Sequence, residues 1–300
     1  MQYGRRRYRV RHVTRYTYSG VLEACYNRGV LQPREAPGQQ VISSEVLATP
    51  PSELVSSHTD YYGNSSVYLE CRAPTTELVI AATSVLEVDR TPPDIAALDV
   101  WTVAGAAAHL AEHADPVEFA EFTLPSPQVA LGSEVHAYAA SVLRPERPLG
   151  EAVEALVHRI HADFRYRKGA TSVRTTLAEL LELRQGVCQD FAHLAVGCLR
   201  AVGLPARYVS GYLETAPPPG RPKLQGADAT HAWASVLTPS GDWLDLDPTN
   251  DHFIDSRYLL TAWGRDFSDV SPLRGVVFTE AATSKLVVEV DVDPLPLIAH

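Results

Sequence analysis

Cysteine and long apolar runs are both scarce in this chain of 300 residues. Its four cysteines are too few and too scattered for a disulfide scaffold in a chain of this length, which fits a reducing compartment. No segment approaches the roughly 20 apolar residues that span a bilayer, and the basic N-terminus does not lead into an apolar signal segment. We therefore expect a cytoplasmic protein with no membrane partner.

The chain also has fewer basic than acidic residues. The chain has 26 lysines and arginines against 36 aspartates and glutamates, and its formal net charge is −10. Sequence-independent binding to the phosphate backbone of nucleic acids needs a strip of basic surface, so we expect no nucleic-acid partner. The short run from Arg5 to Arg7, with Arg9, Arg11 and Arg15 close behind, is the exception, and its alternating charges indicate the solvated face of a strand. The oligomeric state stays open.

The first part of the chain has the pattern of β-strands. Residues 8–18, 66–70 and 77–88 either alternate polar with apolar residues or are rich in β-branched ones. Prolines and a Gly-Asn pair between these runs indicate turns. We therefore predict an N-terminal antiparallel β-sandwich over residues 1–90.

The pattern changes after residue 90. We assign residues 91–130 to a linker with some helix, 131–275 to a core domain, and 276–300 to a C-terminal strand and tail. The core has helical periodicity first and strand patterns afterwards, which predicts an α+β fold. The predicted elements are helices over 104–114, 134–142, 149–163, 176–183 and from Cys188 to about Gly203, then strands over 206–213, 232–237, 242–246 and 285–292, the last returning to one of the sheets.

Cys188 stands at the start of a predicted helix. Gly186 lets the backbone turn sharply there, so that the thiol and the Cys188 N–H face a cleft. A free thiol with a pKa of ~8.5 is mostly protonated at neutral pH, and a helix dipole contributes only ~0.3–1 kcal/mol toward ionising it. A nearby imidazole must therefore activate a catalytic cysteine.

His231 is the imidazole that fits best, because it opens a predicted strand with Trp233 on the same face. The indole of Trp233 would exclude water from the ion pair. A carboxylate should hold the far ring nitrogen of His231. Both Asp247 and Asp245 lie on one face of a regular strand, so spacing leaves open which of them does so.

A zinc site is the other use of cysteine and histidine. Cys188, His193 and Cys198 are the nearest set, but residues five apart on a helix do not share a face, and no local chelating pair is present. The chain also lacks a phosphate loop, a dinucleotide fingerprint and a calcium loop. We expect no metal or cofactor, with His193 structural or on the surface and Cys198 buried.

Four segments follow one another along the core, and these are residues 186–193 (GVCQDFAH), 203–212 (GLPARYVSGY), 231–233 (HAW) and 247–250 (DPTN). Together they resemble the bacterial transglutaminase-like superfamily. The resemblance covers about residues 130–275, where 264–275 is similar to the post-catalytic segment of that family. The stretch 8–88 resembles the β-rich domain that often precedes this core in bacteria.

The resemblance implies a papain-like core with Cys188 as nucleophile, His231 as general base and acid, and Asp247 as orienting carboxylate. It leaves the oxyanion donor open between the Cys188 N–H and the side chains of Gln185, Gln189 and Tyr166. The remaining residues are expected to support the core and the cleft wall, and these are Asp190, Arg207, Tyr212, Trp233 and Asp245.

Such a triad attacks an acyl carbon through a thioester, and the acceptor decides the reaction. Water gives a peptidase or amidase, which we favour for this chain because it shows no sign of the extra domains or calcium dependence of animal transglutaminases. A primary amine as acceptor gives a transglutaminase, the alternative enzyme. A non-catalytic module that binds a peptide or protein is the alternative of a different class.

Overall fold

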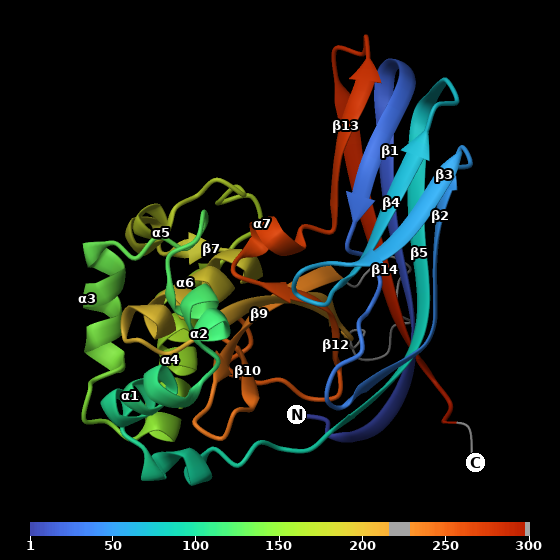
Figure 1. The fold of residues 1–300 in the computed structure, drawn as a ribbon. Helices are drawn as coiled ribbons and strands as arrows, with labels where there is room; N and C mark the ends of the chain where they lie inside the picture. The colour runs from blue at the N-terminus through green and yellow to red at the C-terminus, as the bar shows by residue number, and fades with distance from the viewer. Residues whose placement is uncertain (216–228, 298–300) are drawn as a thin grey trace, which may run out of the picture.

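The computed structural model describes residues 1–215 and 229–297. It consists of a β-rich part and a helical part that lie side by side (Figure 1). The β-rich part has one sheet of seven strands, and the helical part has a second sheet of five. The predicted α+β class is confirmed.

The first sheet is built around one long strand, β1 (Gly4–Gly29). The pairing of β1 is irregular between Thr17 and Leu22, and the strand folds over there at the top of Figure 1. Strands commonly change layer at such bends. The seven strands thus form two layers that share β1, with β2 and β14 at the edges of one layer and β3 and β13 at the edges of the other. The other strands are β2 (Gln39–Thr49), β3 (Leu54–Thr59), β4 (Ser65–Cys71), β5 (Thr75–Arg90), β13 (Leu273–Thr279) and β14 (Ser284–Leu295).

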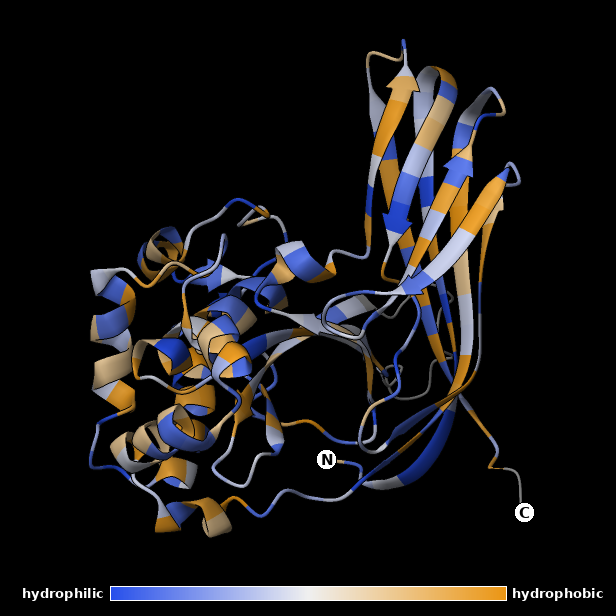
Figure 2. Ribbon diagram, viewed as in Figure 1, coloured by the Kyte–Doolittle hydropathy of each residue, from blue (hydrophilic) through white to orange (hydrophobic). Residues whose placement is uncertain are grey.

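The two layers enclose an apolar core, as the predicted sandwich requires. Leu22 and Leu69 come from one layer, and Leu78 and Ile80 from the other, and all four are nearly inaccessible to water. Apolar and polar residues alternate along these strands in Figure 2. The edge strand β3 escaped prediction because its serine-rich sequence is exposed throughout and its pairing with β4 defines it.

The end of the chain belongs to this sandwich. β13 pairs with Leu22–Gly29 of β1, and β14 pairs with its first half, from Arg7 to Tyr18. The strand predicted over 285–292 therefore does return to a sheet. The domain limits themselves remain a prediction, but the hydrogen bonding assigns residues from Leu273 to Leu295 to the first domain. Residues 298–300 of the predicted tail lie outside the described residues.

The segment assigned as a linker packs into the helical domain. It holds η1 (Ala96–Val100), α1 (Val103–His113) and α2 (Pro116–Thr123). Thr102 and Asp115 cap the two α-helices by accepting backbone N–H groups. On α1, Val103, Ala106 and Leu110 form a stripe that is buried in the core. This burial makes the segment part of the domain rather than a free connection.

Helix α6 (Cys188–Ala201) occupies the centre of the helical domain. Its residues from Asp190 to Arg200 are all buried, because helices surround it on one side and the second sheet covers the other. The helices predicted from spacing are confirmed to within one or two residues. They are α3 (Ser133–Val142), α4 (Leu149–Asp163), α5 (Leu177–Leu183) and α6, and a short α7 (Phe267–Val270) follows the sheet.

The second sheet is antiparallel, with the strand order β11-β10-β9-β8-β12. On β9, Ala232, Ala234 and Val236 face the core that contains α6, and Trp233 lies in a second cluster on the other face. The strands are β8 (Ala206–Leu213), β9 (Ala229–Leu237), β10 (Trp243–Asp247), β11 (His252–Phe253) and β12 (Tyr258–Gly264).

Apolar packing and hydrogen bonds join the two domains. Tyr8 and Val10 of β1 pack with Tyr212 and Leu259 of the second sheet. The side chain of Gln39 accepts from the N–H and donates to the carbonyl of Leu260, at 2.8 and 2.7 Å. No helix within residues 1–215 and 229–297 has both the length and the apolar character to cross a membrane.

Candidate active site

Cys188 is the first residue of α6, as predicted. A parallel pair of two-residue strands, β6 (Arg165–Tyr166) and β7 (Gln185–Gly186), leads into it. Asp190 stabilises the helix start, because its Oδ2 accepts the Val187 N–H at 2.8 Å and the Thr171 hydroxyl at 2.6 Å.

Gly186 serves this helix start differently from our prediction. The residue near the turn with a positive φ is Arg184, at 53°, and Gly186 has an ordinary φ. A Cβ on Gly186 would lie 2.8 Å from Asp190 Oδ2. Glycine is required there because the Asp190 carboxylate approaches the backbone closely.

The structure brings together Cys188, His231 and Asp247. His231 Nε2 lies 2.7 Å from Asp247 Oδ2. Cys188 lies close enough to His231 to raise the pKa of the imidazole. Since Nε2 is engaged by Asp247, Nδ1 is the ring nitrogen that remains for the thiol. Cys188 is partly exposed, whereas Cys25, Cys71 and Cys198 are buried.

Asp247 is completely buried and held by several donors. Its Oδ2 accepts from His231, from the Tyr258 hydroxyl at 2.6 Å and from the Asn250 side-chain amide at 2.7 Å. Its Oδ1 accepts the Thr249 N–H at 2.8 Å. Donors on both oxygens keep the carboxylate charged in spite of its burial.

The charges of this pair stabilise each other. Burial lowers the pKa of His231, but Asp247 and the nearby Cys188 outweigh burial and raise it to about 10. Burial alone would raise the pKa of Asp247, yet the His231 charge and the bonds from His231, Tyr258 and Asn250 lower it to about 2. The imidazolium and the carboxylate are therefore the favoured forms at neutral pH.

Asp245 and Asp247 occupy different positions, which spacing alone left undecided. Asp245 Oδ1 accepts from Trp233 Nε1 at 3.2 Å, and Asp247 is the carboxylate that contacts His231. The Trp233 ring is fully buried, with its centroid 6.3 Å from that of His231. Trp233 thus covers one side of the imidazole, as predicted from its place on the strand.

The candidates for the oxyanion donor differ in position. The Cys188 N–H is at the first helical residue, where amides have no partner within the helix. Tyr166 lies close enough to Cys188 for the thiol's charge to raise the tyrosine pKa, after burial as the main cause. The Gln185 side chain instead accepts from Arg167 at 3.1 Å. Gln189 is half-buried in the first turn, and its side chain makes no hydrogen bond within the described residues.

The supporting residues act partly between domains. Tyr212 is buried, its hydroxyl donates to the Leu31 carbonyl at 3.0 Å, and it also contacts the ring of His12. It therefore ties the second sheet to β1 rather than forming a cleft wall. His193 is buried and accepts the Phe267 N–H at 3.1 Å, which is a structural role. Cys198 is fully buried, as expected.

Sequence reasoning missed Tyr258 and Asn250. Asn250 had a local signal, since it follows Asp247 by three residues in a turn whose N–H groups bond back to that carboxylate. Tyr258 had none, because only the pairing of β12 with β8 carries it to Asp247. Within residues 1–215 and 229–297, no group of three or more histidine, cysteine or acidic side chains gathers as metal ligands would.

Comparison with known proteins identifies the family of this chain. Residues 136–248 match the Transglutaminase-like superfamily, and residues 8–87 match the Bacterial transglutaminase-like N-terminal region. An uncharacterized protein of Mycobacterium tuberculosis, Rv2569c, is 44% identical over 299 residues, which cover 97% of this chain and 94% of its own. The chain belongs to the transglutaminase-like superfamily.

Two further proteins are similar to this transglutaminase-like chain. The crystal structure of a "putative cysteine protease" from Cytophaga hutchinsonii superimposes with a TM-score of 0.78 and 19% identity, over 100% of this chain and 94% of the other. A protein-glutamine gamma-glutamyltransferase of Pseudomonas aeruginosa is 36% identical over 101 residues, which are 32% of this chain and 15% of that protein.

These similarities confirm the predicted architecture of the transglutaminase-like protein, a papain-like core preceded by a β-rich domain. The family relationship also supports a cysteine-based catalytic function.

Proposed function

We propose that this protein is a cysteine-nucleophile enzyme that cleaves a peptide or amide bond through a thioester. The contact chain from Cys188 through His231 to Asp247 is the observation that carries the proposal. It supplies a thiol, a base that can hold its proton, and a buried carboxylate that stabilises the charged base.

In the first half-reaction the Cys188 sulfur, having given its proton to His231, attacks the carbonyl carbon of a peptide or amide. The oxygen becomes negatively charged in the tetrahedral intermediate, next to the Cys188 N–H at the helix start. The intermediate collapses when His231 donates its proton to the leaving nitrogen. An amine departs, and the acyl group remains on sulfur as a thioester.

In the second half-reaction His231 takes a proton from water, and the water oxygen attacks the thioester carbon. The carbon–sulfur bond breaks, the acid product leaves, and the proton returns from His231 to the sulfur. Asp247 keeps the ring orientation through both steps, because its Oδ2 holds Nε2 while Nδ1 exchanges the proton.

Transfer to a primary amine is the second candidate. The local similarity to a protein-glutamine gamma-glutamyltransferase favours it, and the chemistry up to the thioester is the same. An amine then replaces water as the attacking group, and a new amide forms. We keep hydrolysis as the main proposal, with a peptide or protein as substrate.

Mass spectrometry separates these functions. A peptide library is incubated with the wild type and with Cys188→Ala, in the presence and absence of a primary amine. Cleavage masses that need Cys188 support hydrolysis, and peptides that gain the amine while losing ammonia indicate transfer. Peptides that stay unchanged but co-purify equally with both forms would contradict the enzymatic proposal and favour a binding module.

A cytoplasmic location also remains part of the proposal. Fractionation of the bacterial cell tests it, because the protein should then follow a soluble cytoplasmic marker. Recovery with the secreted or envelope fraction would contradict it.

A further inference from the structure

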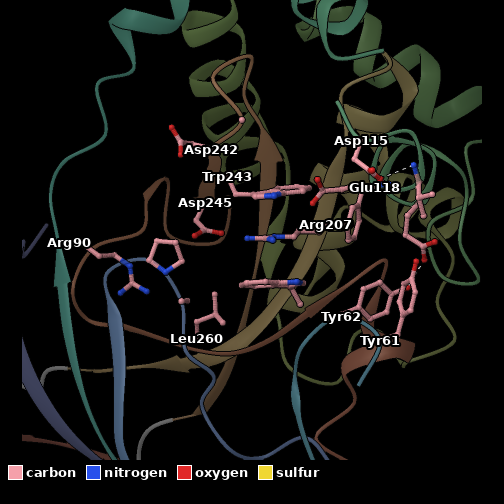
Figure 3. Close-up of a pocket in the computed structure, with 17 residues that line it drawn as sticks. Tyr61, Tyr62, Arg90, Asp115, Glu118, Arg207, Asp242, Trp243, Asp245 and Leu260 are labelled. Atoms are coloured by element: carbon pink, nitrogen blue, oxygen red, sulfur yellow. Dashed lines mark hydrogen bonds between the residues drawn. The ribbon is translucent and has the colours of Figure 1, made fainter. Parts of the chain in front are cut away.

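A cavity of about 650 Å³ lies between the two domains (Figure 3). Its walls come from loops of the sandwich domain, from α2 and from strands β8, β10 and β12 of the second sheet. Cys188, His231 and Asp247 do not line it. The cavity is therefore separate from the candidate active site.

The guanidinium group of Arg207 is clamped between two indole rings in this cavity. Its central carbon lies 4.1 Å from the ring centroid of Trp243 and 3.7 Å from that of Trp263. The flat faces of the guanidinium group are thus covered. In Figure 3 its nitrogen atoms point along the cavity toward Asp245.

Arg207 makes no close ion pair within the described residues, although the charges of Asp245 and Glu118 act on it. The residue is only 6% exposed, its Nε has no hydrogen bond, and no carboxylate within residues 1–215 and 229–297 forms a salt bridge with it. Burial lowers the pKa of Arg207 to about 9, although the charges of Asp245 and Glu118 oppose this shift. A buried guanidinium group without a hydrogen-bonded carboxylate is costly, and its planar N–H edge matches such a carboxylate.

Acidic side chains make up much of the remaining polar wall. Glu121 is already engaged by the Tyr62 hydroxyl at 2.6 Å and by Arg265 at 3.3 Å. Neither Glu118 nor Asp242 forms a salt bridge within the described residues, although Glu118 is near enough to Arg207 to act on its charge. Five carboxylates and two guanidinium groups line the cavity in all, and these are Asp115, Glu118, Glu121, Asp242, Asp245, Arg90 and Arg207.

We propose that this cavity binds a free amino acid or short peptide that carries one carboxylate and at least one ammonium group. The ligand carboxylate accepts hydrogen bonds from Arg207, and its ammonium groups pair with Glu118 and Asp242. The surplus of carboxylates disfavours phosphate and dicarboxylates and favours a diamino acid such as lysine. The proposal does not depend on the catalytic function of Cys188.

Calorimetric titration of the full-length protein tests this, with tryptophan fluorescence as a second readout, since Trp243 and Trp263 are two of only four tryptophans. The probes are L-lysine, L-alanine, L-glutamate, acetate, n-butylamine and inorganic phosphate. We expect lysine to bind at least roughly tenfold more tightly than acetate, butylamine or glutamate. Acetate has no ammonium group, butylamine has no carboxylate, and glutamate places a second carboxylate among the acidic residues of the cavity. Equal or tighter binding of phosphate, acetate or glutamate would overturn the proposal, as would no binding of lysine at concentrations of roughly 20 mM.

Variants assign the binding to these residues. Arg207→Gln should weaken lysine and alanine alike by at least roughly tenfold. Because Arg207 is buried and its variant can fail to fold, Glu118→Gln at a half-exposed position is the second test. It should weaken lysine severalfold and leave alanine within about twofold. Glu112→Gln, an exposed acidic residue on α1 away from the cavity, is the matched control. An equal effect of both glutamate variants would refute the assignment.

Discussion

The hydroxyl of Tyr258 donates a 2.6 Å hydrogen bond to Oδ2 of Asp247, the same oxygen that His231 Nε2 contacts at 2.7 Å. Burial and the charge of Asp247 raise the pKa of Tyr258, so its hydroxyl keeps its proton and stays a donor. A residue from β12 thereby fixes the carboxylate that orients the imidazole.

Tyr258→Phe removes only this hydroxyl. We expect kcat/KM to fall roughly tenfold, because a hydrogen bond to a charged group is worth about 1.5–3 kcal/mol and its loss loosens Asp247. The matched control is Tyr16→Phe, in the sandwich far from the site and with no hydrogen bond from its hydroxyl within the described residues. An unchanged kcat/KM in Tyr258→Phe would show that Asp247 does not need this bond.

Asp247→Asn and Asp245→Asn form a matched pair two residues apart on one strand. Asp247→Asn should lower kcat by roughly a hundredfold or more, because it removes the charge that supports the His231 cation. Asp245→Asn keeps an acceptor for Trp233 and should change kcat by less than about tenfold. Steady-state kinetics on one peptide substrate compares the two, and a larger loss in Asp245→Asn would reverse our assignment.

Alkylation should single out Cys188. It is the partly exposed cysteine of the four and contacts His231, whereas burial raises the pKa of Cys25 to about 11 and that of Cys198 still further. At pH 6 an iodoacetamide-type reagent should modify Cys188 roughly a hundredfold faster than the others, as peptide mapping would reveal. Replacing His231 with Gln should remove most of this preference. Equal rates at all four cysteines would contradict an activated thiol.

The His231–Asp247 pair should also shape the pH dependence of stability. The folded pKa of His231, at about 10, is above the ordinary value of about 6.5, so the folded state holds its proton more tightly. This contribution is complete below pH ~6.5 and is lost progressively as the pH rises toward ~10. Urea unfolding of the wild type should therefore show a falling free energy from pH 6.5 to 9.

The same measurement on Asp247→Asn provides the control, because its His231 loses the charge that raises its pKa. The variant should be less stable at pH 6.5, and the difference from the wild type should shrink toward pH 9. A difference that grows with pH would mean that the folded pKa of His231 is not raised.

Local sequence was sufficient for the elements around the cysteine. The spacing of Ala192, Ala195 and Leu199 after Cys188 defines α6, and the strand patterns over 206–213 and 242–246 define β8 and β10 to within a residue. These segments are buried in a regular pattern, so the hydrophobic period of the sequence predicts their secondary structure. The serine-rich β3 carries no such pattern, because it lies at an exposed edge.

The sequence by itself determined a thiol at a helix start, an imidazole on a strand and two carboxylates on the next strand, since periodicity and turn residues are local properties. Spacing left Asp245 and Asp247 open, and the family resemblance implied Asp247, which the structure places against His231. Only the tertiary structure decided that Tyr258 secures that contact and that Trp243 and Trp263 enclose Arg207. These outcomes depend on how β8, β9, β10 and β12 pair and on how the sandwich packs against them. Contacts between residues so far apart in the sequence cannot be predicted from the spacing of neighbouring residues.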